Sequence, residues 1–255
     1  MNVTRVPVEV PTRAPTGTTN AYVVGTDSAV LVDPAARTDA LDDAVAGRDV
    51  EHVAVTHTHP DHVGAVAHYA DALDATTWAR YGRTDLFERA TAVEPDRTYR
   101  EGDAVAGLDV LDTPGHAVDH VAFRADDAVL CGDLAVAAGS VVVGHPEGDL
   151  RAYLTALRRL HAMHPRVLHP GHGPTIEDPR ETCERLIAHR LDRERAVLAA
   201  VRDGADTVPA ITDRAYEKDV SDVRDLAEAT VHAHVQKLAH ERRVRWVDGR
   251  VHPVE

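Results

Sequence analysis

Aromatic side chains are scarce in this sequence, because only 4% of its residues are Phe, Trp or Tyr. A globular chain of 255 residues can still bury a sizeable core, but here the core must be built mainly from aliphatic side chains. Cysteine is also rare. The two cysteines, Cys131 and Cys183, exclude a disulfide framework and are predicted to be buried thiols.

Long apolar runs are missing as well. No run approaches the length of a membrane-spanning helix, and the N-terminus lacks a basic segment followed by an apolar core. The sequence therefore predicts a cytoplasmic protein with no membrane partner. It carries no pattern that indicates an oligomeric state.

Lysine is the third deficit. Lys218 and Lys237 are the only lysines, and Lys plus Arg total 28 against 42 for Asp plus Glu, which gives a formal net charge of -14. Acidic, lysine-poor surfaces stay hydrated where high ionic strength screens their self-repulsion. We therefore interpret the protein as salt-adapted. The same charge weakens electrostatic capture of phosphate groups.

The sequence does contain a dense group of metal ligands, directly after a short apolar run. His57 and His59 lie two residues apart, so in an extended strand end they point the same way and can bind one ion. Pro60 is expected to force a turn, after which Asp61 and His62 face elsewhere. The motif therefore predicts two adjacent metal ions.

Three further candidate ligands are His116, Asp133 and His172. Each follows a strand-like apolar run and lies beside a glycine, which lets the backbone turn sharply or approach another segment closely. Imidazole ligands with one position left open to solvent are typical of a catalytic zinc rather than a closed structural one. The other histidines considered are assigned to surface or supporting roles: His52, His68, His120, His145 and His169.

Taken in order, the motifs HxHxDH, GH, GD and GHG resemble those of the metallo-β-lactamase-fold superfamily of hydrolases, over roughly residues 1–178. The resemblance implies an α/β fold, a four-layer αββα sandwich. It also implies the ligand sets: His57, His59 and His116 for one metal, Asp61, His62 and His172 for the other, with Asp133 bridging the two. The metals are expected to be two zinc ions, with manganese or iron left open. A hydroxide between them would be the nucleophile, oriented by Asp61 and Asp133.

Apolar runs bounded by turn residues predict the strands of this sandwich. They cover residues 3–10, 20–24, 29–33, 50–55, 75–79, 98–99, 103–105, 108–112, 120–124, 128–131 and 166–168. Helices are predicted over 64–72 and over 150–163, the second with Asp149 as its N-cap.

The composition changes after Pro174, and residues 179–255 are predicted to form a second domain after a catalytic domain of residues 1–178. Helices are expected over 179–203, 208–217 and 221–241, followed by a hairpin of 244–247 and 250–252 around an Asp-Gly turn. This order is that of a winged helix. The segment resembles the tail of the subgroup that contains the β-lactamase-like protein 2 endoribonucleases. Its third helix has few basic residues, so we expect it to wall the active-site cleft and not to bind duplex DNA.

These features predict a dinuclear metal-dependent hydrolase. β-Lactam hydrolysis is not expected, because two-zinc β-lactamases usually have cysteine where this chain has Asp133. The tail favours a single-stranded RNA endoribonuclease-like phosphodiesterase. The acidic charge favours the alternative, a thioesterase of the hydroxyacylglutathione hydrolase type acting on a small ester or thioester.

A hypothesis of another class is a metal-sensing regulator whose winged helix binds DNA. Arg190, Arg193 and Arg195 lie on one predicted helix, where they are either solvated charges or contacts for an anionic substrate.

Overall fold

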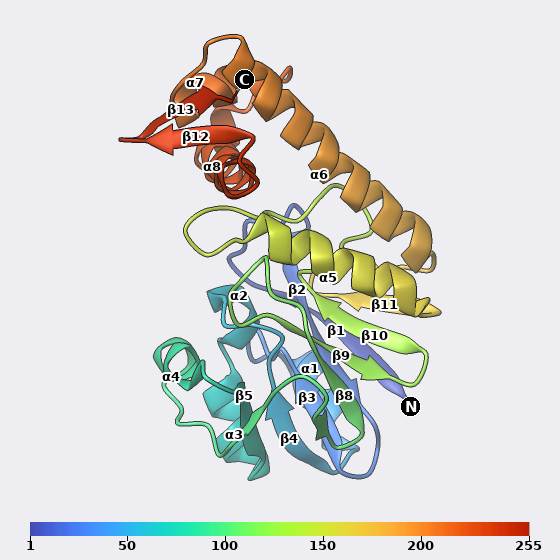
Figure 1. Ribbon diagram of the computed structural model, residues 1–255. Helices are drawn as coiled ribbons and strands as arrows, with labels where there is room; N and C mark the ends of the chain where they lie inside the picture. Colours follow the sequence, from blue (N-terminus) through green and yellow to red (C-terminus); the bar gives the residue numbers. More distant parts are fainter. Residues whose placement is uncertain (255) are drawn as a thin grey trace.

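Two β-sheets packed face to face form the centre of the fold (Figure 1), in a computed structural model that describes residues 1–254. The first sheet contains, in spatial order, β1 (Val3–Glu9), β2 (Thr18–Val24), β3 (Ala29–Val32), β4 (Val50–Ala54), β5 (Thr76–Arg80) and β6 (Arg97–Tyr99). The second contains β11 (Val167–Pro170), β10 (Ala128–Gly132), β9 (Val121–Ala125), β8 (Leu108–Asp112) and β7 (Ala104–Val105). β3 to β6 run parallel, whereas β7 to β10 form antiparallel pairs.

Helices cover the outer face of each sheet. The first sheet is covered by α1 (Asp39–Ala46), α3 (Val66–Leu73) and α4 (Thr84–Thr91), and the second by α5 (Leu150–Met163) and α6 (Pro179–Arg202). The two sheets and the helices on their outer faces make four layers, and three apolar cores fill the spaces between these layers. The middle core joins the two sheets through side chains such as Val30, Val110 and Phe123. The expected αββα sandwich is therefore the fold of this part of the chain. Cys131 and Cys183 are buried and free, as predicted.

Most predicted elements are confirmed, but the helices α1, α2 and α4 were missed, and the prediction for Pro60 was wrong. α1 and α4 are eight residues long, and each buries only two side chains, which gives little helical periodicity to detect. Pro60 does not force a turn. It occupies the first turn of α2 (Pro60–Val63), a position where proline is favoured because its missing N–H would have no helical partner.

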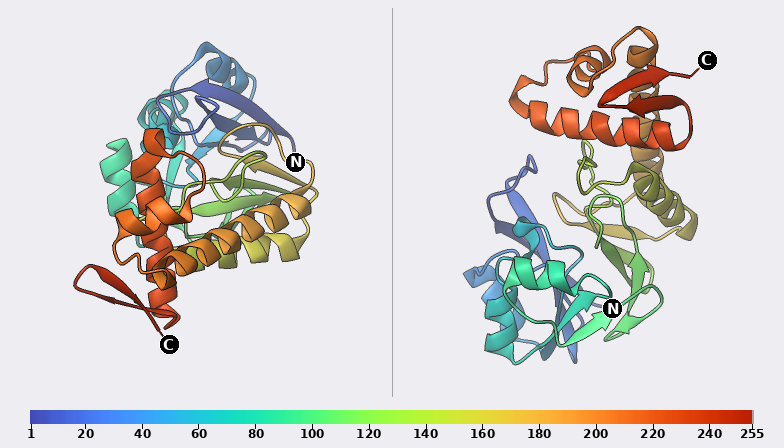
Figure 2. Two further views of the ribbon diagram at one scale, coloured as in Figure 1. Left: turned by 90° about the horizontal axis from the view of Figure 1, so that it is seen from above. Right: turned by 60° about the vertical axis from the view of Figure 1, so that its left-hand side comes forward.

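The remaining elements lie at the far end of α6 (Figures 1 and 2). They are α7 (Val208–Ala215), η1 (Ser221–Val223), α8 (Arg224–His240) and a hairpin of β12 (Val244–Val247) and β13 (Arg250–Pro253). These elements share an apolar core with the second half of α6, whereas the first half of α6 packs on the second sheet. A domain boundary at residues 178 and 179 stays a prediction. None of the helices described over residues 1–254 is long and apolar enough to cross a bilayer.

Candidate metal centre

The seven candidate ligands come together at one end of the sandwich, on segments that follow strands of both sheets. His57 and His59 follow β4, and Asp61 and His62 lie in α2. The other three follow β8, β10 and β11: His116, Asp133 and His172. Strand-end loops of a rigid sheet therefore bring side chains together that are more than a hundred residues apart in the chain.

Backbone hydrogen bonds hold these loops across the two sheets. The Val121 N–H donates to the Thr56 carbonyl at 2.8 Å, and the Asn20 N–H donates to the Gly171 carbonyl at 2.8 Å. Gly171 has no room for a side chain, because a Cβ atom there would lie 2.4 Å from Oδ1 of Asp133. The glycine beside His172 therefore allows the backbone to approach Asp133 closely.

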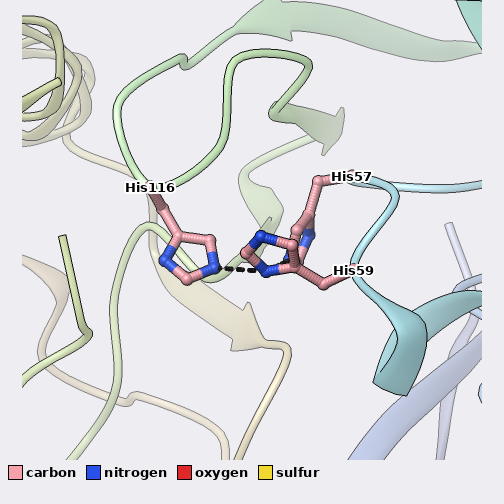
Figure 3. A group of neighbouring side chains, drawn as sticks. All are labelled: His57, His59 and His116. Atoms are coloured by element: carbon pink, nitrogen blue, oxygen red, sulfur yellow. Dashed lines mark hydrogen bonds between the residues drawn. The ribbon is translucent and has the colours of Figure 1, made fainter. Parts of the chain in front are cut away.

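The first ligand group consists of His57, His59 and His116, whose rings point toward one another (Figure 3). Nδ1 of His59 lies 3.0 Å from Nε2 of His57 and 2.9 Å from Nε2 of His116. The ligand atoms of a tetrahedral zinc site, each about 2.0–2.1 Å from the metal, lie roughly 3.3 Å from one another. The three nitrogens therefore lie close to the spacing that such an ion needs.

The second ligand group consists of Asp61, His62 and His172. Nε2 of His172 lies 3.6 Å from Oδ2 of Asp61. Asp133 lies between the two groups: its Oδ2 is 3.4 Å from Nε2 of His116 and 3.3 Å from Nε2 of His172, and its Oδ1 is 3.6 Å from Nε2 of His62. A carboxylate in this place can contact ions held by both groups.

Outer hydrogen bonds fix each histidine ring of the second group. Nδ1 of His62 donates to Oδ2 of Asp33 at 3.0 Å, and Nδ1 of His172 donates to the Thr18 carbonyl at 2.8 Å. In both rings Nε2 is left as the free nitrogen that faces the site. This is the arrangement that metal-binding histidines adopt, with the second nitrogen held by a carboxylate or a carbonyl.

The first group is fixed in the same manner by different partners. Nδ1 of His57 lies 3.1 Å from the Thr56 hydroxyl oxygen, and Nδ1 of His116 donates to the Val142 carbonyl at 2.7 Å. Nε2 of His59 donates to Oε2 of Glu147 at 2.9 Å, so that Nδ1 is its free nitrogen. In all five rings, therefore, the nitrogen opposite the outer partner faces the site.

Two buried atoms support a bound cation. Nε2 of His62 and Oδ1 of Asp133 are inaccessible to solvent and have no hydrogen-bond partner within residues 1–254. Buried polar groups are almost always satisfied, so unpaired atoms that face a ligand cluster fit an ion that they would bind. The residues present therefore fit a divalent metal pair.

The electrostatics of the second group also favour positive charge. Burial opposes protonation of His62, but the hydrogen bond to Asp33 and the charges of Asp33, Asp133 and Asp61 raise the pKa of His62 to about 9. Burial likewise opposes ionisation of Asp133, yet its close contact with His172 and the nearby histidines hold its pKa far below the usual value. Carboxylates that attract a proton to His62 would attract a metal cation in the same way.

The first group is adapted to neutral rings. Burial lowers the pKa of His57 well below its usual value, and burial lowers the pKa of His116 to about 4. Metal ligation needs the unprotonated imidazole. Binding at neutral pH therefore displaces no proton from these two rings.

Several residues of the centre were missed by sequence reasoning. Asp33 is buried and accepts hydrogen bonds from the Thr56 N–H and hydroxyl in addition to His62. Its place at the end of an apolar strand was a usable signal. Thr12, whose hydroxyl donates to Oδ2 of Asp61 at 2.5 Å, and Glu147 lie in loops that carry no such signal.

The other histidines lie outside the two groups. His120 is not at the surface: it is fully buried and accepts the backbone N–H of Asp133 at 3.0 Å, which agrees with the predicted supporting role. His169 packs against Tyr22, His52 accepts the Trp78 N–H, His68 is exposed and His145 stacks on His232.

The ligands open into a cavity of about 660 Å³. Its walls are mainly apolar and come from residues 11–16 between β1 and β2, residues 136–142 after β10, and Leu226 in α8. Among residues 1–254, Arg13 is the only charged residue lining the cavity besides the candidate ligands, and its guanidinium contacts Oδ1 of Asp225 in α8 at 3.0 Å. The C-terminal segment therefore contributes to the cavity wall, as expected.

The α6 arginines do not line this cavity. Arg190 is buried and donates to the Val141 carbonyl, so it is neither a solvated charge nor a substrate contact. Arg193 donates to the Ala215 carbonyl, and Arg195 pairs with Asp192 at the surface. The prediction of a solvated or substrate-binding helix face was therefore wrong for Arg190, because α6 is covered by neighbouring segments there.

Comparison with known proteins agrees with this geometry. The family model of the metallo-beta-lactamase superfamily matches residues 14–172. A beta-lactamase-like protein 2 homolog of Caenorhabditis elegans is 28% identical over an alignment of 255 positions, which covers 91% of this chain and 84% of that protein. An atrochrysone carboxyl ACP thioesterase of Aspergillus fumigatus is 29% identical over 198 residues, covering 72% of this chain and 60% of that protein. The crystal structure of a metallo-beta-lactamase family protein from Thermus thermophilus is similar over 99% of this chain and 98% of that one, with a TM-score of 0.80 and 27% identity.

Proposed function

Because this chain belongs to the metallo-beta-lactamase superfamily and is a metal-dependent hydrolase, we propose that it hydrolyses an ester or thioester with an apolar acyl group. The cavity wall carries the proposal. Apart from the candidate ligands its lining is mainly apolar, with Arg13 as the one cationic side chain among the described residues. Apolar walls that bury a substrate's hydrocarbon supply binding energy in proportion to the area removed from water.

The chemistry assigns a role to each side chain of the centre. The first and second ligand groups would each hold one divalent ion, which we propose to be zinc, and Asp133 would contact both. Such a metal pair supplies water activation and polarisation of the scissile carbonyl. Asp61 and Asp133 face the cavity, and we assign their carboxylates to orient the attacking water by accepting its hydrogen bond.

Single-stranded RNA is the second candidate substrate, from the sequence resemblance. The lining is poorly suited to it, because phosphodiester binding depends on several cationic contacts and the described part of the cavity wall offers Arg13 alone. The similar proteins include thioesterases, among them the atrochrysone carboxyl ACP thioesterase, and that supports the first candidate.

We also propose that α7, α8 and the β12–β13 hairpin act as a winged-helix-like wall and not as a DNA-binding module. The one arginine and the one lysine of α8 are already paired: Arg224 with Asp213 and Glu228, and Lys237 with Glu194 and Glu241. A regulator that binds duplex DNA would need free cations on this helix. A cytoplasmic location and adaptation to concentrated salt stay proposals from the sequence, the second of them testable by melting curves.

Hydrolysis assays with graded substrates test the proposal. Acetyl, butyryl and octanoyl esters of p-nitrophenol, the matching acyl thioesters and labelled single-stranded RNA are each incubated with and without chelator. We expect chelator-sensitive ester and thioester hydrolysis, with kcat/KM rising by up to about 4-fold for each buried methylene group. RNA should remain intact.

A matched pair of variants locates the acyl site. Leu226→Trp fills part of the cavity and should lower kcat/KM for the octanoyl substrates more than for the acetyl ones, whereas Val223→Trp places a tryptophan at an exposed position and should not. Chelator-sensitive RNA cleavage without ester hydrolysis would overturn the assignment. So would the same kcat/KM for every acyl chain length.

A further inference from the structure

One short segment joins the C-terminal helices to the first ligand group. This support loop, residues 141–149, lies between the cavity wall and α5. On its outer side the His145 N–H donates to the Ala229 carbonyl of α8 at 3.0 Å, and the His145 ring lies 3.7 Å from the His232 ring, centroid to centroid. Arg190 of α6 donates to the carbonyl of Val141 at the start of the loop.

The inner side of the support loop contacts two of the three histidines in the first group. Glu147 accepts the hydrogen bond from His59, and the Val142 carbonyl accepts that from His116, as described above. At the end of the loop the Asp149 N–H donates to the Gly115 carbonyl, beside His116, at 2.9 Å. Three hydrogen bonds therefore link the position of the support loop to the orientation of the His59 and His116 rings.

The backbone that carries Glu147 is held in a fixed place. The Gly148 N–H closes a turn to the Gly144 carbonyl at 2.7 Å, and a Cβ atom on Gly148 would lie 2.4 Å from the Gly144 nitrogen. A Cβ atom on Gly144 would in turn lie 2.9 Å from Cβ of Ala229. The loop backbone is thus packed tightly against α8, which fixes the position from which the Glu147 side chain reaches His59.

We propose that Glu147 is a positioning residue for His59, and that α8, acting through the support loop, sets the metal affinity of the first ligand group selectively. The Glu147 carboxylate holds Nε2 of His59 so that Nδ1 faces His57 and His116. A carboxylate behind a ligating imidazole fixes the ring and raises its basicity. Within residues 1–254 the second ligand group has no contact of this kind with the loop, since its outer partners are Asp33, the Thr18 carbonyl and the Thr12 hydroxyl.

This inference rests on the proposed metal pair, and the test separates the two. Wild-type protein, Glu147→Ala, Glu147→Gln and Glu147→Asp are equilibrated with zinc at graded free concentrations, and bound metal per chain is measured. The same proteins are loaded with cobalt(II), whose visible absorption reports ligand geometry. Glu88→Ala is the matched control, because Glu88 is exposed on α4 on the other side of the sandwich.

We expect Glu147→Ala to bind one of two ions about 10- to 100-fold more weakly and to leave the other unchanged. Glu147→Asp should recover part of the affinity, Glu147→Gln less, and the cobalt spectrum should change only for the weakened ion. His232→Ala, which removes the ring stacked on His145, should weaken the same ion by a smaller factor.

Three results would overturn the inference. If wild-type protein binds two ions and Glu147→Ala binds them equally well, the positioning role is wrong while the proposed function stands. Equal weakening of both ions would contradict selectivity. A wild-type protein that binds no metal would remove both the inference and the proposed function.

Discussion

The two ligand groups of the centre differ in where their support comes from. His62 is held by the buried carboxylate of Asp33, directly after β3, and His172 by a backbone carbonyl of β2. His59 and His116 are held by a loop that depends on α6 and α8. The side chain of Asp33 is 1% exposed, whereas that of Glu147 is 59% exposed. A buried carboxylate therefore supports His62 of the second group, whereas the carboxylate that holds His59 of the first group is reached by solvent.

The largest expected effect comes from Asp33→Asn, which acts on the sheet-supported group. Asp33 accepts hydrogen bonds from His62 and twice from Thr56, and an amide would place an N–H against one of these donors. A buried donor left unpaired costs about 1–3 kcal/mol of stability. We also expect roughly 100-fold weaker binding of the ion at the second group.

Urea unfolding of the metal-free protein and zinc titration measure the two effects. Asp43→Asn, an exposed substitution on α1, is the matched control. Loss of the first ion instead of the second would contradict the separation of the two groups, as would wild-type stability in the metal-free Asp33→Asn protein.

A smaller effect is expected from Thr12→Val, because it removes one partly buried contact of the second group. The Thr12 hydroxyl donates to Oδ2 of Asp61 at 2.5 Å, and valine keeps the shape without the donor. We expect about 10-fold weaker binding of the second ion, unchanged binding of the first, and nearly unchanged stability. Zinc titration checks this, with Thr155→Val on the exposed face of α5 as control. A variant that loses the first ion would show that residues 11–16 act on the whole cavity.

The same contrast explains how much the sequence could predict. The candidate ligands were found because each one follows an apolar strand, and strand periodicity is a local signal. Asp33 follows a strand too, so its place near the centre was predictable in principle. Glu147 was not, because residues 133–149 have no periodic pattern and their position depends on contacts with Arg190 and Ala229, which lie far along the chain.

The C-terminal elements show the same limit. The order of helices and hairpin could be predicted from periodicity and the Asp248–Gly249 turn, and the structure has these elements. Burial of Arg190 could not be predicted, because α6 contributes to two cores and its charge pattern resembles that of an exposed helix. Long-range packing, which local sequence does not encode, decides which arginines of this helix meet solvent.

Salt should produce the smallest effect and should distinguish the two groups by exposure. Raising potassium chloride from 0.1 M to 1 M shortens the screening length from about 10 Å to about 3 Å. Screening reaches the exposed Glu147 contact with His59 but not the buried Asp33 contact with His62. The affinity deficit of Glu147→Ala for zinc, relative to wild type, should therefore shrink in 1 M salt, whereas that of Asp33→Asn should persist.

Over the same range of potassium chloride the melting temperature of the wild-type protein should rise, because salt screens the repulsion among the acidic groups that give its net charge of -14. A melting temperature that stays constant or falls would contradict salt adaptation, and equal salt responses of the two variants would contradict the contrast between the groups.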